Sequence, residues 1–455
     1  MVTMPKAAEP LVAAFSIAFT RPTFQRVLTL MLGAILSLRR RTVTGMLRTL
    51  GPLATGHWSD FHRVWCRASW SLWPMGRVLA GLILELIPPD QPVIVPVDDT
   101  ALQHKGKRVY GKGRHYDAVR STHRHVVWVW GHKWVVLAIN VKFPFASRPW
   151  ALPVCCALYR PEELNRGENR RHKTPIRLAM QLMATLIHWF PQRQFILVGD
   201  GGYASHELAQ FCHRHRGHVT LVSRFHPDAN LYDAPSPKRS PKGGRPRLKG
   251  RKRPAPSKIV KRSQSKRFTV NWYGGKTRRV ELIHGEGHWY KGGDGLVPVR
   301  WVFVHDVQGT HRDEYFYSTD VTLCPEQIVS LYTGRWSIEV SFQEVRAHLG
   351  FTTPRNWSKK SVLRTAPCLL GLFSLVSLIF ARHPRDSGRP GRPPRVAPAT
   401  MPWYTKTEIT FSDAMTQVRR LCWETVLKQS PKHGGIAKLP IGLRRTLLDH
   451  LSQAA

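Results

Sequence analysis

The central part of the chain alternates short apolar runs with amphipathic segments, and this alternation restricts the fold more than any other feature. Runs of apolar and β-branched residues at 91–99, 194–200 and 218–224 are typical of buried strands. The segment 175–190, which opens on a proline, and a second one from about residue 204 have the pattern of helices. Strands and helices in this order predict an α/β fold with one mixed sheet.

Three further apolar patterns complete this outline. The stretch 126–141 predicts a β-hairpin that turns near Gly131–Lys133, and short strand-like segments between 268 and 306 predict a β-rich region. Pro96 is unfavourable inside a central strand and counts against the first predicted strand. The run 366–381 predicts a buried core helix, because its length is short of the roughly 20 residues that span a bilayer.

The flanking regions have other patterns. Residues 15–88 repeat apolar side chains at helical spacing, which fits either a DNA-reading helix-turn-helix or plain helical packing. Residues 238–267 hold 14 Lys or Arg and no acid, and they predict a mobile basic loop. A Pro/Arg-rich linker is expected at 381–402, followed by two amphipathic helices at 412–428 and 442–451.

The chain is strongly basic, with 69 Lys and Arg against 29 Asp and Glu. A net charge of +40 favours a polyanionic partner, and nucleic acid is the usual one. An acidic membrane surface is the competing partner, but we expect neither a spanning segment nor a signal peptide at 1–20. The seven scattered cysteines, without CxxC pairs, favour a reducing cytoplasm over a disulfide framework.

Acids are scarce, so those that end buried strands are the first candidates for chemistry. Asp98 and Asp99 end the first predicted strand, and Asp200 ends a later one just before two glycines. Strand ends in an α/β sheet meet at one edge, where sites are usually built. Strand alternation places Asp98 and Asp99 on opposite faces of the sheet, and it leaves open which of the two acids belongs to the site. Taken singly, each Asp is more often a turn or cap residue.

The segment 332–346, YTGRWSIEVSFQEVR, supplies a third acid. Wound as one helix, it places Glu339 on a stripe with two arginines and a tyrosine, beside an apolar stripe. An ordinary solvated helix face is the alternative. Three carboxylates at one edge would suit Mg²⁺, and two such ions activate a water or a 3′-hydroxyl in phosphodiester transfer.

Four residues of this segment follow the spacing Y-x2-R-x3-E-x6-K, with arginine at the lysine position: Tyr332, Arg335, Glu339 and Arg346. With the DDT run at 98–100 and the LVGDGGY run around Asp200, this signature makes the chain resemble the DDE transposases of bacterial insertion sequences, in the YREK branch. The resemblance covers residues 90–380 or so. Arginine for lysine keeps the charge but alters the geometry of a phosphate contact.

The resemblance implies an α/β protein whose RNase H-like mixed-sheet catalytic core is interrupted by a β-rich insertion, with helical N-terminal and C-terminal regions. The expected parts are a helical DNA-binding domain at 1–90, the core at 91–225 and 306–381, the basic loop and insertion at 226–305, and the linker with a helical tail at 382–455.

The same resemblance implies excision and integration of an insertion sequence, with Mg²⁺ as the cofactor and Mn²⁺ able to substitute. Asp98 rather than Asp99 would hold the metal with Asp200 and Glu339, and these three acids would be catalytic. The tyrosine and the two arginines of the signature would contact DNA. The expected partners are double-stranded transposon ends and target DNA, bound by a homodimer at the nucleoid of a prokaryotic cytoplasm, without a membrane.

Several alternatives stay open. Related enzymes stack a flipped base on an aromatic residue, and Trp289 and Trp336 are the candidates, with core packing as the alternative for each. A non-catalytic DNA-binding protein derived from a transposase, or a nuclease without joining activity, would have the same fold. The acid trio favours the enzyme, because binding alone does not need acids that repel phosphate. A zinc site around Cys212 is disfavoured, because its ligands would run from a helix end into a strand.

Overall fold

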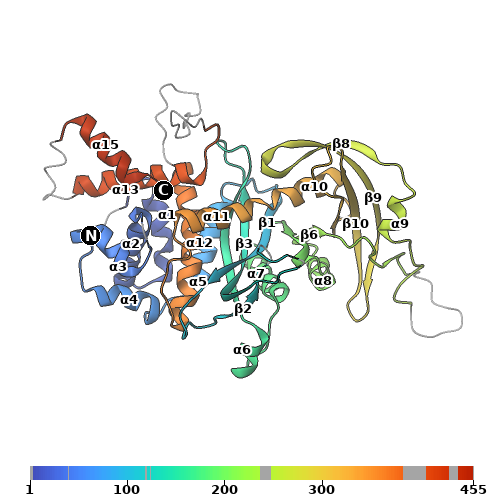
Figure 1. Ribbon diagram of the computed structural model, residues 1–455, viewed down its shortest axis with the longest axis horizontal. Coiled ribbons are helices and arrows are strands. Elements are labelled where there is room, and N and C mark those ends of the chain that lie inside the picture. The colour runs from blue at the N-terminus through green and yellow to red at the C-terminus, as the bar shows by residue number, and fades with distance from the viewer. Residues whose placement is uncertain are drawn as a thin grey trace.

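The computed structural model describes residues 4–38, 40–117, 120–122, 124–235, 247–382, 406–429 and 439–453. Within these ranges, 11 strands form one continuous mixed sheet. Figure 1 shows the helices of both chain ends gathered at one end of the molecule and the yellow strands of residues 266–306 at the other, with the core between them.

Five strands form the core of this sheet: β1 (Val93–Gln103), β3 (Trp128–Val141), β4 (Trp150–Tyr159), β5 (Phe195–Gly199) and β6 (Val219–Arg224). Their spatial order is β4-β3-β1-β5-β6. The pairs β4–β3 and β3–β1 are antiparallel, whereas β5 runs parallel to β1 and β6 runs parallel to β5. This order and these directions are those of an RNase H-like fold, so the predicted fold class is confirmed.

Two helices connect the later core strands. α7 (Pro175–Trp189) precedes β5, and α8 (His206–Arg214) joins β5 to β6. Thr174 and Ser205 cap them, because each side-chain oxygen accepts a hydrogen bond from a backbone N–H of the first turn. α7 packs on β3 and β4, and α8 packs on β6. Both helices were expected from the apolar spacing.

The predicted hairpin at 126–141 is wrong, because β3 is a single strand of 14 residues through this stretch. Gly131 does not turn the chain but pairs with Gln103 of β1. A Cβ atom added to Gly131 would lie 1.8 Å from the carbonyl oxygen of Leu102, so the glycine permits close backbone approach. Pro96 is tolerated in β1 because the ladder with β3 begins only at the next residue.

The insertion adds four antiparallel strands: β7 (Leu231–Tyr232), β8 (Lys266–Asn271), β9 (Thr277–Lys291) and β10 (Gly295–Asp306). They are followed by β11 (Glu314–Ser318). β11 pairs with β6 on one side and with β10 on the other, which joins the insertion to the core. A short helix, α9 (Pro256–Val260), packs on β10. Of the predicted basic loop at 238–267, residues 238–246 lie outside the described residues, and the rest contains α9 and the start of β8.

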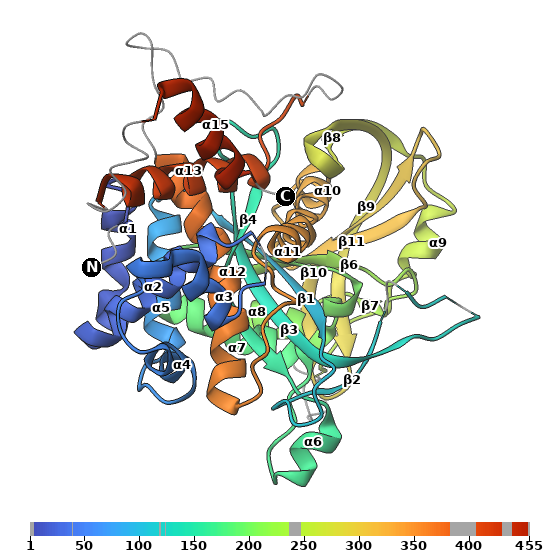
Figure 2. The ribbon, with the colours of Figure 1, turned by 60° about the vertical axis from the view of Figure 1, so that its left-hand side comes forward.

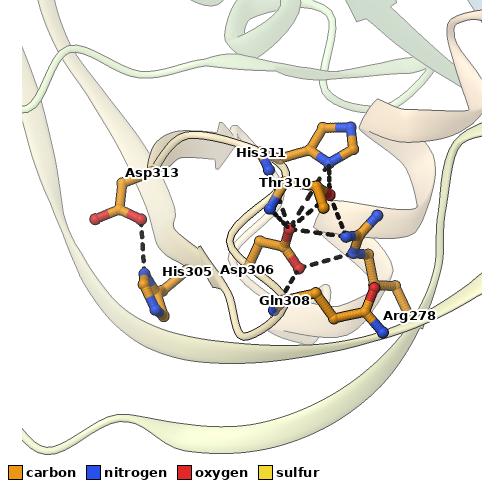
Figure 3. Close-up of polar contacts among 7 residues, drawn as sticks. All are labelled: Arg278, His305, Asp306, Gln308, Thr310, His311 and Asp313. Atoms are coloured by element: carbon orange, nitrogen blue, oxygen red, sulfur yellow. Dashed lines mark hydrogen bonds and ion pairs between the residues drawn. The ribbon is translucent and has the colours of Figure 1, made fainter.

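A buried carboxylate holds the turn between β10 and β11 (Figure 3). The two oxygens of Asp306 accept hydrogen bonds of 2.7 and 2.9 Å from the guanidinium of Arg278. They also accept from the backbone N–H groups of Gln308, Thr310 and His311. Burial alone would raise the pKa of Asp306, but these donors outweigh it and lower the pKa to about 2.

The N-terminal region consists of helices, as predicted: α1 (Glu9–Ala13), α2 (Arg21–Leu36), α3 (Val43–Leu50), α4 (Trp58–Cys66) and α5 (Leu72–Leu84). Short 3-10 turns follow α1 and α3. α3 ends at Gly51 with a φ of 54°, the backbone conformation that favours glycine at a helix end.

The C-terminal helices α13 (Phe411–Gln429) and α15 (Ile441–Ser452) lie beside the N-terminal ones, as both ribbon views show (Figures 1 and 2). The buried Arg419 of α13 donates a 2.8 Å hydrogen bond to the carbonyl oxygen of Ile35 in α2. Both predicted tail helices are confirmed, whereas residues 383–402 of the predicted linker lie outside the described residues.

The long helix α12 (Lys359–Arg382) packs between β4 and the helices α4, α5 and α13. By length and composition it is the one helix of the described chain that could cross a membrane. Of its most apolar window, 78% is buried inside the protein, which agrees with the predicted core helix. Two smaller elements, β2 (Gly113–Tyr116) on the edge next to β3 and α6 (Glu162–Gly167), complete the core region.

Candidate active site

The core sheet brings two of the predicted acids to neighbouring strands. The prediction that Asp98 and Asp99 end the first strand is wrong, because β1 continues to Gln103 and Asp98 lies in its middle. Asp200 follows directly after β5, as predicted. In the parallel ladder Val97 pairs with Gly199, so Asp98 and Asp200 come next in register. One oxygen of Asp200 accepts a 2.9 Å hydrogen bond from the backbone N–H of Gly202, and this turn fixes the side chain at the strand end.

The third acid comes from a helix pair on the same face of the sheet. α10 (Pro325–Gly334) and α11 (Ser337–His348) are separated by a two-residue turn at Arg335 and Trp336. The segment 332–346 is therefore not one helix, and α11 begins at Ser337, close to the start around Trp336 that Gly334 in the sequence favours. Glu339 lies in the first turn of α11, which packs on β1 and β4.

The break between the two helices places Arg335 between two of the acids. Its Nη1 donates a hydrogen bond of 2.8 Å to Oδ2 of Asp98, and its Nη2 donates one of 2.9 Å to Oε1 of Glu339. The Arg335 side chain is only 7% exposed. A buried guanidinium thus connects a core strand with the helix that carries Glu339.

The electrostatics of this group favour a protonated acid. Burial raises the pKa of Asp98 to about 7, against the opposing charge of Arg335 and with help from the charges of Asp200, Asp99 and Glu339. Burial also raises the pKa of Glu339, again against Arg335. Burial therefore outweighs the charge of Arg335 and shifts both acids toward their protonated forms.

The alternation of β1 separates Asp98 from Asp99, as expected for a strand. Asp99 makes an ion pair of 3.0 Å with Nζ of Lys133 on β3 and does not join Arg335. Burial raises the pKa of Asp99, and the charge of Lys133 opposes this. Of the two neighbouring acids, it is Asp98 that shares the guanidinium of Arg335 with Glu339.

The two other members of the signature occupy different environments. Tyr332 is 4% exposed and stacks on Phe316 with ring centroids 4.1 Å apart, and burial raises its pKa to about 12. This burial is at odds with the predicted contact between Tyr332 and DNA, since the ring supports Arg335 from within the core. Arg346 lies on an exposed part of α11 and donates a hydrogen bond to Oγ1 of Thr100, two residues beyond Asp98.

The two candidate tryptophans also differ. Trp289 packs edge-on against the rings of His206, Phe225 and Tyr317, which favours the core-packing alternative for this residue. Trp336 is 45% exposed and lies directly after Arg335. Its ring contacts Tyr273 at a centroid distance of 6.0 Å.

Two residues near the acids were missed in the sequence. Arg224 ends β6, beside the loop of Asp200, and forms an ion pair with Glu314. The strand-end rule applied to 218–224 would have found it. Tyr273 reaches the site from the insertion, where burial raises its pKa and the charges of Arg335 and Arg224 oppose this. No local pattern marks Tyr273, because its position depends on how the insertion folds back.

The acids fit a hard divalent cation by donor type. Carboxylate oxygens are the preferred ligands of such ions, and a bound cation would favour the charged form of Asp98 that burial disfavours. In the described part of the chain, no three His, Cys, Asp or Glu side chains are already arranged around a common metal position. Here Arg335 links Asp98 and Glu339 instead.

The comparisons agree with this geometry. The family model described as "DDE superfamily endonuclease" matches residues 14–279, more than half of the chain. The chain belongs to the DDE superfamily of endonucleases. A second model, "Archaeal putative transposase ISC1217", matches residues 290–375 of this endonuclease. The first match includes Asp98 and Asp200, and the second includes Glu339.

Solved structures add a distant similarity. A cryo-EM structure of the piggyBac transposase synaptic complex with hairpin DNA is 12% identical, with a TM-score of 0.41 over 97% of this endonuclease and 80% of that chain. A similarity of this degree carries no argument about activity. No match was found among curated proteins.

Proposed function

We propose that this DDE endonuclease is a transposase that excises and integrates an insertion sequence by phosphodiester hydrolysis and strand transfer. The observation that carries the proposal is the bridge from Arg335 to Asp98 and Glu339, which joins two acids from distant parts of the chain. Membership of the endonuclease superfamily supports cleavage of DNA. The YREK signature favours the corresponding branch of insertion-sequence transposases.

Asp98, Asp200 and Glu339 are the residues that would hold the metal, and we propose Mg²⁺, with Mn²⁺ able to substitute. When bound, the ions would activate the attacking water or 3′-hydroxyl and stabilise the leaving oxygen. The carboxylates themselves would hold negative charge at the end of the parallel strands, and Asp98 would need to lose its proton before it can serve as a ligand.

Two arginines would receive the DNA. Arg335 is held at both terminal nitrogens, while its buried Nε has no hydrogen-bond partner among the described residues. A scissile phosphate between the acids could accept from this guanidinium. Arg346, exposed on α11, would hold a neighbouring phosphate. Trp336, at the break between the helices, would stack an extruded base.

The other parts of the chain would serve this core. We propose the division into a DNA-binding N-terminal domain at 1–90, a core at 91–225 and 306–381, an insertion at 226–305, and a linker and tail at 382–455. Two ends of an element must be brought together, so the active species would be a homodimer on double-stranded DNA. It would work at the nucleoid of a prokaryotic cytoplasm.

The experiment uses a labelled duplex that carries the element end, identified from the DNA flanking the gene. Cleavage in Mg²⁺ is compared between wild type, Glu339→Gln and Asp200→Asn. Glu344→Gln is the matched control, because Glu344 lies on the same helix and pairs with His348 rather than with Arg335. We expect all four proteins to bind the duplex, and only wild type and Glu344→Gln to cut it.

Other outcomes would redirect the assignment. Equal cleavage by all variants would mean that the acids are not the catalytic group. Binding without cleavage by wild type, in both Mg²⁺ and Mn²⁺, would favour a non-catalytic DNA-binding protein. Cleavage without any joined product in the presence of target DNA would favour a nuclease that does not transfer strands.

A further inference from the structure

The hairpin of β2 and β3 exposes aromatic rings that a soluble surface rarely shows. Tyr116, Trp128 and Trp130 are 51%, 47% and 56% exposed. Large exposed aromatic groups that lie close together commonly mark binding sites. Figure 2 shows this teal hairpin projecting from the edge of the sheet, away from the packed helices. We call these three rings, with Lys112 and Arg114, the aromatic strip.

Strand alternation puts the rings of the strip on one face. Trp128 and Trp130 are two positions apart in β3, and the intervening Val129 is buried. The antiparallel register pairs Tyr116 with Trp128 and Arg114 with Trp130, so both β2 residues share the face of the indoles. The sequence therefore builds a flat surface of rings, and none of them belongs to the hydrophobic core.

Cations accompany these rings. The guanidinium of Arg114 lies 4.4 Å from the ring centroid of Trp128, and Nζ of Lys112 lies 5.7 Å from that of Trp130. Residues 101–116 contain no acid, and Lys105, Lys107 and Arg108 in this segment are exposed. The chemistry that matches such a surface is a chain of phosphates with planar apolar groups attached, which is nucleic acid.

The spacing of the indoles distinguishes unpaired from paired bases. Residues i and i+2 of a strand lie about 6.8 Å apart, twice the 3.4 Å that separates stacked bases along one strand of a duplex. Rings at this distance fit neighbouring bases of an extended single strand, and they do not match the base stack of a double helix. An exposed ring on a strand also offers its face to any base, without reading sequence.

The strip lies on the same face of the sheet as Asp98. Asp98 pairs with Val136 of β3, so these two side chains share a face. Val136 and Trp130 are six positions apart in the same strand, so Trp130 lies on this face too. The backbone N–H of His104 donates to the carbonyl oxygen of Trp130, so the strip begins six residues along β1 from Asp98, about 20 Å away. A few unpaired nucleotides can cover this distance.

We propose that the aromatic strip binds two unpaired bases of single-stranded DNA, with Trp128 and Trp130 as stacking platforms and Lys112 and Arg114 as phosphate contacts. The strip would hold the strand that is released when a DNA end is opened at the acids. This inference rests on the proposed function only in taking DNA as the ligand. It concerns a second surface, separate from the carboxylates and from Trp336.

The test measures binding by fluorescence anisotropy in EDTA, so that no cleavage takes place. The probes are a labelled oligo(dT) and a labelled duplex, each of roughly 20 nucleotides or base pairs. The variant Trp128→Leu/Trp130→Leu keeps apolar bulk and removes the aromatic faces. Trp128→Phe/Trp130→Phe retains smaller faces, and Val126→Ala alters an exposed apolar residue of the same hairpin that has no ring.

We expect the Leu pair to bind oligo(dT) about tenfold or more weakly, while its duplex affinity and the oligo(dT) affinity of the Val126→Ala control stay within about twofold of wild type. The Phe pair should recover most of the loss. Unchanged oligo(dT) binding by the Leu pair would overturn the proposal, and so would an equal loss for both probes. Circular dichroism of each variant shows whether the hairpin change unfolds the protein; if the Leu pair does unfold, the Phe pair and the single Trp128→Leu variant carry the comparison.

These results are independent of cleavage. A protein that binds oligo(dT) through the strip but never cuts an element end would refute the proposed function and leave the strip intact. A protein that cuts its ends, but whose Leu pair binds oligo(dT) like wild type, would refute the strip alone.

Discussion

The guanidinium of Arg335 donates a hydrogen bond of 2.8 Å to Asp98, a residue 237 positions earlier in the chain. The same group holds Glu339 at 2.9 Å. One positive charge thus faces two buried or half-buried carboxylates, with Asp200 close enough to raise the pKa of Asp98 further. A strongly basic protein therefore gathers negative charge at one place in its core, and this is costly unless a cation arrives.

The first prediction concerns stability and pH. The pKa of Asp98 is about 7 in the folded protein and about 3.9 in an unfolded chain, so the folded state binds more protons between these values. Stability should therefore fall as pH rises from about 4 to 7 and then level off. In EDTA at pH 8, Asp98→Asn should unfold a few degrees above wild type, and the difference should be much smaller at pH 5. Thermal unfolding of both proteins, followed by circular dichroism at pH 8 and pH 5, measures this difference. The same difference in unfolding temperature at both pH values would contradict the prediction.

A second prediction concerns metal binding without DNA. A cation that binds the folded acids and not the unfolded chain raises the unfolding temperature. We expect Mn²⁺ and Mg²⁺ to raise it for wild type at pH 8, and to have no such effect on Asp98→Asn or Glu339→Gln. Glu344→Gln, on the same helix as Glu339, should keep the wild-type shift. An unchanged shift in Glu339→Gln would place the metal elsewhere.

The third prediction separates the two arginines of the signature. Arg335→Lys keeps the charge but cannot bridge two carboxylates with a planar fork, so cleavage should fall by about a hundredfold. Arg346→Lys restores the lysine of the signature and should cleave within about threefold of wild type. Single-turnover cleavage of the end duplex measures both rates. Equal effects of the two substitutions would contradict the bridging role of Arg335.

A fourth prediction concerns the insertion. Asp306→Asn removes a buried charge that accepts from Arg278 and from three backbone N–H groups, and should destabilise the protein by about 3 kcal/mol at pH 7. Because the pKa of Asp306 is lowered to about 2, wild type keeps this stabilisation above about pH 4 and loses it as pH falls toward 2.

Figure 3 shows the matched control for this prediction, the more exposed pair of Asp313 with His305. Asp313→Asn should cost less than about 1 kcal/mol, because solvent screens such a pair. Urea denaturation of both variants provides the comparison. Equal losses would mean that the turn at Asp306 does not hold the insertion in place.

Patterns of local periodicity predicted much of the core. β5, β6, α7 and α8 follow apolar runs of the length and spacing that these elements require, and the position of Asp200 at a strand end follows from the same reasoning. The buried part of α12 was also expected from the apolar run 366–381, although the helix itself begins earlier, at Lys359. These elements could be predicted because the burial of their apolar side chains leaves a periodic pattern in the local sequence.

Other features depend on distant parts of the chain. Gly131 has the appearance of a turn residue, yet its lack of a side chain serves the close approach of β1. The bridge at Arg335 joins Asp98, 237 positions earlier, to Glu339, so its position depends on how the sheet and the helices pack together. Trp289 has glycine neighbours that are typical of a loop, yet it lies in β9 and packs against rings from α8, from β11 and from Phe225 after β6. No local pattern contains these contacts.

The most direct test of the acid site replaces one non-bridging oxygen of the scissile phosphate by sulfur. Sulfur binds Mg²⁺ poorly and Mn²⁺ better, so a metal held by Asp98, Asp200 and Glu339 against this phosphate should leave cleavage slow in Mg²⁺ and restore it in Mn²⁺. Glu339→Gln should show no restoration. Equal rates of wild type in both metals, or cleavage in EDTA, would contradict a metal held by these three acids.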